Sequence, residues 1–185
     1  MRNVWIVSMA VVLGLMSGCA QTGKGNALNS TSERRTQGTV LDDKNIEMRA
    51  QQRVAEKYKS NVQVNVTCFN RYALITGQVA NEAVKMDIER IVGGIPPVKG
   101  IANELQVSGV ASKGVRSSDS GVTADVQKGF LSSKAFNRDH IKVFTEAGVV
   151  YLMGIVTHAE ANAAAEIAST TAGVQKVVRV FEYMD

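Results

Sequence analysis

Positions 148–156, GVVYLMGIV, read as a β-strand, in which residues at a period of two share one face. The residues on one face of the strand are Val150, Leu152, Gly154 and Val156. Because Gly154 has no side chain, it leaves room for a second backbone to approach. Thr157 follows, three residues before Glu160, which is the spacing of a capping box. The stretch therefore predicts a strand that leads directly into a helix.

The same pattern occurs once more, earlier in the chain. Residues 72–79, YALITGQV, place Gly77 and Val79 where Gly154 and Val156 stand, at a common offset. Repetition at a fixed offset indicates repeated structural units. This offset is too long for a solenoid and suits two copies of a small domain. A unit of about 65 residues is marginally stable alone, so we expect the two copies to pack together.

Each copy is predicted to run helix, strand, strand, helix, strand. The result is an α+β fold in which two helices cover one face of a three-stranded mixed sheet. In the first copy, Asp42 or Asp43 is the expected N-cap of the first helix and Asn81 that of the second. In the second copy, Gly173 ends the second helix. The predicted strands are residues 62–68, 72–79, 100–107, 141–145, 149–156 and 174–183.

Local composition predicts a tether, a linker and the bounds of the two domains. Residues 19–41 are rich in Gly, Ser, Thr, Asn and Gln, which predicts a flexible tether. A Ser, Gly and Lys-rich linker over residues 109–121 separates a first domain, 42–108, from a second, 122–185. Within the tether, Arg34 and Arg35 either contact phosphate headgroups or form a solvated charge pair.

Residues 1–18 read as an export signal, with Arg2 before an apolar run too short to span a bilayer comfortably. The run ends in LMSGC, which resembles the lipobox of bacterial lipoproteins, so Cys19 is the predicted acylation site and mature N-terminus. The alternative is a plain secretory signal with an incidental cysteine. Ala20 follows Cys19, which in enterobacteria-like sorting implies the outer membrane. The other cysteine, Cys68, is predicted to be a small buried side chain, and not a reactive thiol.

Charge narrows the possible partners. The formal net charge of +4 and pI of about 9.1 suit an anionic surface without identifying one. Nucleic-acid binding would call for a denser Lys/Arg stripe with interleaved aromatics, and aromatics are only 5% of the chain. We therefore expect no nucleic-acid partner.

The sequence predicts no enzyme, metal or cofactor. His140 and His158 are expected to face solvent, and with no Cys cluster or HExxH they make no metal site. No nucleophile elbow or Walker loop occurs, and Gly93 with Gly94 reads as a helix stop.

The second face of the strand at 149–156 is also apolar. Its residues are Val149, Tyr151, Met153 and Ile155, whereas the matching residues of the first copy, Tyr72, Leu74, Thr76 and Gln78, are more polar. A lone domain should not leave such a face in water. We expect it to pack on the first domain or on a partner.

The pattern of strand, Gly-x-Val, helix, Gly-Val and closing strand resembles the BON domain. The resemblance is most specific in VYLMGIVTHAEANAAAEIAS and the following GVQKVV. Two such domains behind a lipobox resemble the dual-BON outer-membrane lipoproteins. Pro97 stands where Gly173 stands in the second copy, a small departure.

This resemblance implies a periplasm-facing lipoprotein that binds anionic phospholipid and supports envelope integrity, with enrichment at the division site. The family's lipid contact lies in the first helix of the second domain, here residues 122–135. By this resemblance, the expected lipid-binding residues of the present chain are Lys128, Phe130, Leu131 and Lys134. They combine cations with apolar side chains, as an interfacial helix requires. Against this, Val122, Val126 and Phe130 share a helical face and suit the core, and the helix has no Trp. The alternative function is a protein–protein adaptor that recruits an envelope or division protein.

Overall fold

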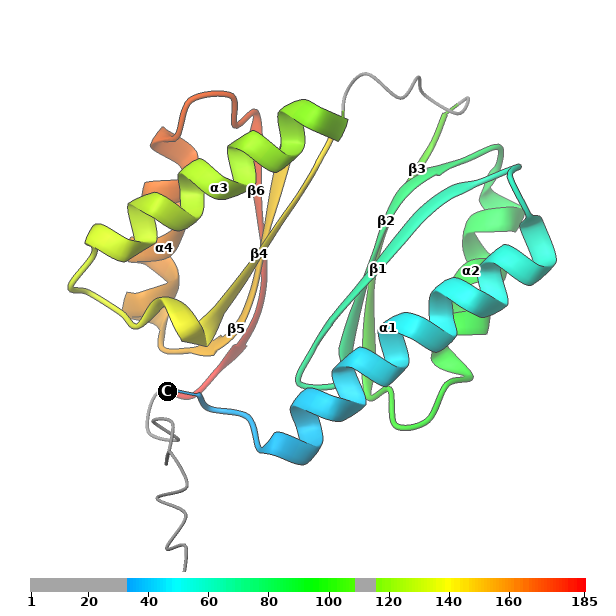
Figure 1. Cartoon of the computed structure of the whole chain (residues 1–185), viewed down its shortest axis with the longest axis horizontal. Helices are drawn as coiled ribbons and strands as arrows, with labels where there is room; N and C mark the ends of the chain where they lie inside the picture. Colours follow the sequence, from blue (N-terminus) through cyan, green and yellow to red (C-terminus); the bar gives the residue numbers. More distant parts are fainter. Residues whose placement is uncertain (1–32, 109–115) are drawn as a thin grey trace, which may run out of the picture.

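A computed structural model describes residues 33–108 and 116–185 as two α+β domains. The first domain contains α1 (Gln37–Tyr58), β1 (Gln63–Phe69), β2 (Tyr72–Val79), α2 (Glu82–Gly93) and β3 (Gly100–Val107). The second contains α3 (Arg116–Ser132), the 3-10 helix η2 (Arg138–His140), β4 (Ile141–Glu146), β5 (Val149–Val156), α4 (His158–Thr170) and β6 (Lys176–Tyr183). The two sheets face each other and the helices lie on the outside (Figure 1).

The two sheets have the same topology, with orders β1-β2-β3 and β4-β5-β6. In each sheet the first two strands are antiparallel and the last two are parallel. The helix between the parallel strands crosses the face that carries the domain core. The predicted α+β fold with two mixed three-stranded sheets is confirmed.

Each domain has its own apolar core between sheet and helices. In the second domain, the predicted inner face of β5 contributes Val150, Leu152 and Val156. Small side chains of α4 pack on this face, and they are Ala161, Ala164, Ala165 and Ala168. The capping box of Thr157 and Glu160 is present at the start of α4, as predicted. The period of two and the spacing of the capping residues were therefore sufficient to predict β5, the start of α4 and the face of β5 that enters the core.

Gly77 and Gly154 occupy equivalent positions where two backbones come close. Gly77 pairs with Val64 across the β1–β2 ladder and has φ +120°, a conformation that L side chains rarely adopt. A Cβ at Gly154 would collide with the carbonyl oxygen of His140, just before β4. The approaching backbone is thus that of the neighbouring strand. Gly173 also needs to be glycine, because its φ is +85° and a Cβ there would lie 3.0 Å from Val122 Cγ2.

The predicted start of the first helix in each domain was wrong, whereas Asn81 caps α2 as predicted. The N-cap of α1 is Thr36, whose hydroxyl accepts a hydrogen bond from Thr39 N, so α1 begins before Asp42. α3 likewise begins at Arg116, within the predicted linker 109–121. The segments at both starts are rich in glycine and hydroxyl residues. This composition is typical of loops, and it led to the prediction of a loop where the helix already begins.

A buried aspartate in the first helix of each domain holds the hairpin turn beneath it. Asp43 accepts hydrogen bonds from the amides of the Asn70–Arg71 turn, at 2.8 and 2.6 Å. Asp119 accepts from the amides of the Ala147–Gly148 turn, at 2.8 and 2.9 Å. All four turn residues have positive φ, and this conformation directs both amides toward the carboxylate. Asp43 is therefore a structural acceptor and not the N-cap that the sequence predicted.

Candidate functional surface

The two domains meet through an apolar cluster between their sheets. This intersheet cluster is formed by Phe69 and Leu74 of the first domain and by Tyr151 and Met153 of the second, each 3% exposed or less. Val149 and Ile155 pack against it and are partly buried. Burial, with the nearby charges of Glu104 and Glu146, raises the pKa of Tyr151 to about 12. The apolar outer face of β5 is thus covered by the first domain.

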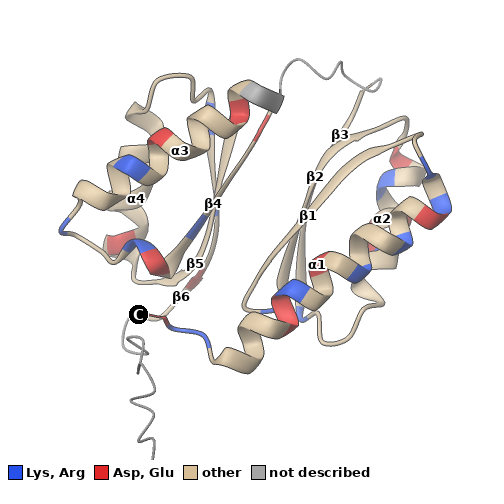
Figure 2. Cartoon of the chain, in the orientation of Figure 1, with Lys and Arg blue, Asp and Glu red and all other residues tan. Residues whose placement is uncertain are grey.

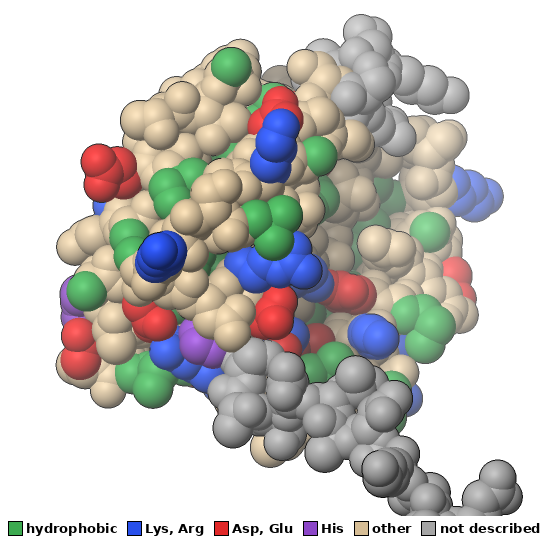
Figure 3. Space-filling view, turned by 60° about the vertical axis from the view of Figure 1, so that its left-hand side comes forward, with side chains coloured by type: hydrophobic (Ala, Val, Ile, Leu, Met, Phe, Trp, Pro, Cys, Tyr) green, Lys and Arg blue, Asp and Glu red, His purple; other side chains and the backbone are tan. Residues whose placement is uncertain are grey.

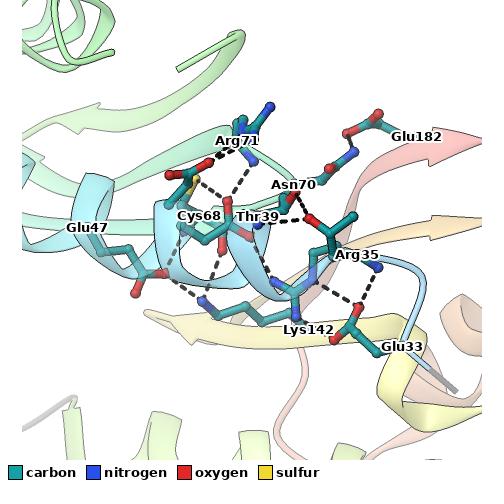
Figure 4. Close-up of polar contacts among 12 residues, drawn as sticks. Glu33, Arg35, Thr39, Glu47, Cys68, Asn70, Arg71, Lys142 and Glu182 are labelled. Carbon is teal, nitrogen blue, oxygen red and sulfur yellow. Dashed lines mark hydrogen bonds and ion pairs between the residues drawn. The ribbon is translucent and has the colours of Figure 1, made fainter. Parts of the chain in front are cut away.

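Polar contacts between the domains surround this cluster. Lys142 Nζ donates to Glu47 Oε1 at 2.5 Å and to the Cys68 carbonyl at 3.1 Å (Figure 4). At another edge, Asn70 Nδ2 donates to Glu182 Oε1 at 2.9 Å. These contacts fix the register between the sheets, because each one joins a residue of one domain to a residue of the other.

The segment before α1 is bound to both domains. Arg34 makes a bidentate ion pair with Glu160, at 2.7 and 2.8 Å, and also donates to the Ile155 carbonyl at 2.6 Å. The hydrogen bonds from Arg34 are the main cause that lowers the pKa of Glu160 to about 2. Arg35 pairs with Glu33 and Asp43 (Figure 4). The prediction that both arginines lie in a flexible tether was therefore wrong.

Further predictions concern the two cysteines and the two histidines. Cys68 is buried and free, and its Sγ donates to Asp43 Oδ1 at 3.3 Å. Burial and then the Asp43 charge raise the pKa of this thiol far above its ordinary value, so it remains protonated. His140 was predicted to face solvent but is buried, whereas His158 is exposed. Cys19 lies outside the described residues.

The predicted lipid-binding residues of the second domain divide into two groups. Phe130 is 2% exposed and packs edge-to-face on Phe136, with ring centroids 5.0 Å apart, so its prediction as a lipid contact was wrong. Lys128, Leu131 and Lys134 are exposed, and neither lysine forms an ion pair with a described residue. We call these three residues the α3 surface. Cationic, acidic and apolar side chains are interspersed on this side of the second domain (Figure 3).

A groove of about 450 Å³ separates α1 from α3. It is lined by apolar residues such as Phe69, Phe130 and Val143 and by charged residues of both signs, which include Lys44, Arg138, Glu47 and Asp139. Both helices lie on the same side of the molecule (Figure 1). Among the described residues, no cluster of His, Cys, Asp and Glu could hold a metal ion. Within residues 33–108 and 116–185, no helix is long and apolar enough to cross a membrane.

Comparison with known proteins agrees with this architecture. The sequence model of the BON domain matches residues 42–109 and 118–185, which defines a protein of two tandem BON domains. The chain is 35% identical to "Outer membrane lipoprotein DolP" of Haemophilus influenzae, over 96% of each chain. It is 30% identical to the "21 kDa hemolysin" of Actinobacillus pleuropneumoniae, over 81% of this chain and 78% of the other. The chain belongs to the DolP family of outer membrane lipoproteins with two BON domains.

Among solved structures, the chain is similar to CdsD, a structural protein of the type III secretion system of Chlamydia trachomatis. The sequence identity is 13% and the TM-score 0.31, over 78% of this chain and 92% of the other. This similarity is too low to support an inference.

Proposed function

We propose that the protein is anchored through acylated Cys19 on the periplasmic face of the outer membrane, where it binds anionic phospholipid and supports envelope integrity. The division site is its proposed place of enrichment. The binding residues are those of the α3 surface. The proposal involves no catalysis and no cofactor.

The observation that carries this proposal is the exposure of a leucine between two unpaired lysines. Leu131 is 61% exposed although it is apolar, and it lies between Lys128 and Lys134 in the sequence. A lysine close to an anionic leaflet contributes about 1 kcal/mol of attraction. An apolar side chain beside it gains further free energy by entering the headgroup region. The α3 surface therefore has the chemistry of a weak interfacial contact.

A vesicle co-sedimentation assay tests the proposal. Residues 20–185, which contain every described residue, are mixed with vesicles of phosphatidylglycerol or phosphatidylcholine. We expect binding to the anionic vesicles alone, and a loss of binding in Lys128→Glu/Leu131→Ser. The matched control, Lys85→Glu/Met86→Ser, makes the same kinds of change on α2 and should bind like wild type. Equal, negligible binding to both vesicles would refute lipid binding.

The second predicted partner is an envelope or division protein. Such a partner would have to use a surface other than the outer face of β5, because Tyr151 and Met153 are buried against the first domain. No described feature favours this adaptor function over lipid binding.

A further inference from the structure

A second amphipathic surface lies on α1, in the first domain. Leu41, Lys44 and Met48 are spaced i, i+3, i+7, so they form one stripe on this helix. Leu41 is 59% exposed and Met48 is 60% exposed, while the core-facing residues of α1, such as Ile46 and Ala50, are fully buried. We call these three residues the α1 stripe. Its apolar side chains have no described covering within the molecule.

The charge around the stripe is positive because the acidic residues of α1's first half are paired elsewhere. Asp42 pairs with Arg71 at 2.8 Å, and Glu47 pairs with Lys142 at 2.5 Å. Asp43 binds Arg35 and the hairpin turn. Lys44 is exposed and has no ion pair with a described residue. The uncompensated charge next to Leu41 and Met48 is therefore a cation.

The α1 stripe and the α3 surface can contact the same membrane surface. α1 and α3 lie on the same side of the molecule (Figure 1). Lys44 lines the groove between them. Acidic and basic residues are interspersed along both helices (Figure 2). On α3, however, exposed Asp125 precedes Lys128 by three residues and pairs with no described residue, which weakens the attraction of that helix for anions. The α1 stripe has two exposed apolar residues against one on α3.

The length of the chain limits how far α1 can lie from the predicted anchor. Cys19 stands 14 residues before Glu33, the first described residue, and α1 begins at Gln37. A fully extended chain spans at most about 3.6 Å per residue, so Glu33 can lie no more than about 50 Å from the acylated cysteine. Among the described helices, α1 is therefore the nearest to the predicted anchor along the chain.

From these observations we infer that the α1 stripe is a second lipid-contact site, which binds the same anionic phospholipid surface as the α3 surface. The two helices then lie on the membrane together, with the groove between them facing the headgroups. This inference rests on the proposed lipid binding and adds a site in the first domain.

The test compares matched double variants of residues 20–185 on phosphatidylglycerol vesicles. Lys44→Glu/Met48→Ser should weaken binding about fivefold or more, the attraction of roughly one lysine to an anionic leaflet. Lys85→Glu/Met86→Ser carries the same two types of substitution on α2 and should bind like wild type. Lys44, Met48 and Met86 are exposed and Lys85 is half-buried, so we expect unchanged melting temperatures.

The possible failures are distinct. If Lys44→Glu/Met48→Ser binds like wild type while Lys128→Glu/Leu131→Ser loses binding, α3 acts alone and the inference is wrong, but the proposed function stands. If the wild type binds neither vesicle, both are wrong. A second measurement attaches an environment-sensitive fluorophore at Met48→Cys or, as control, at Met86→Cys. Vesicles should shift the emission to the blue at position 48 only, and an equal shift at both positions would overturn the inference.

Discussion

Truncation of Met153 to alanine should destabilise the protein as strongly as a change in a domain core. Met153 is 1% exposed and packs in the intersheet cluster with Phe69 and Leu74 of the other domain. Removing its three outer heavy atoms leaves a cavity, and substitutions of buried Met by Ala cost about 2–5 kcal/mol. The two sheets belong to different domains and can approach each other slightly, so we expect a loss of about 2–4 kcal/mol in the free energy of unfolding.

Urea unfolding of residues 20–185, followed by circular dichroism, measures this change. Met86→Ala is the matched control, because Met86 is 69% exposed on α2 and alanine is favourable in a helix. The control should change the free energy of unfolding by no more than about 0.5 kcal/mol. If Met153→Ala were as mild as the control, the sheets would not be packed through this residue in solution, and the described interface would be wrong.

Four other substitutions test three separate features of the fold. Gly154→Ala should lower the free energy of unfolding by more than about 1 kcal/mol, since its Cβ would meet backbone, whereas Gly121→Ala, with no atom within 4 Å of its Cβ, should raise it by about 0.5–1 kcal/mol. Asp119→Ala leaves the two turn amides without their acceptor and should cost about 1–3 kcal/mol in urea unfolding. The pKa of Glu160 is lowered from 4.5 to about 2 in the folded state, so the stability from its pairing with Arg34 is complete above the unfolded pKa and is lost as the pH falls. Glu160→Gln should therefore flatten the dependence of melting temperature on pH between about pH 5 and about pH 2, and an unchanged slope would contradict the assignment.

Local periodicity was enough to predict the domain architecture. The alternation in β5 placed Val150 and Leu152 toward the helices and Tyr151 and Met153 on the opposite face, as the structure does. The sequence of β5 itself could not predict which part of the molecule covers that opposite face. Phe69 lies outside the predicted strand 62–68, but it ends β1 and packs in the intersheet cluster.

Polar contacts between distant parts of the chain were the main features that the sequence did not predict. Arg34 stands in a polar stretch that resembles a linker, and its partner Glu160 is 126 residues away. Asp43 and Asp119 could have been matched, since each precedes its turn by nearly the same number of residues, but Asp43 was interpreted as an N-cap and the contact with the turn was not predicted. For Phe130, the helical period correctly indicated a core residue. The lipid contact implied by the family resemblance therefore remains a prediction only for the exposed residues of this helix.

The bidentate pairing of Arg34 with the second domain has a mechanical consequence. Arg34, which precedes α1, is held by Glu160 and the end of β5, so force applied at the N-terminus passes into the second domain before it reaches α1. A pull from that end therefore loads the second domain first, and α1 is shielded from unwinding until that ion pair breaks.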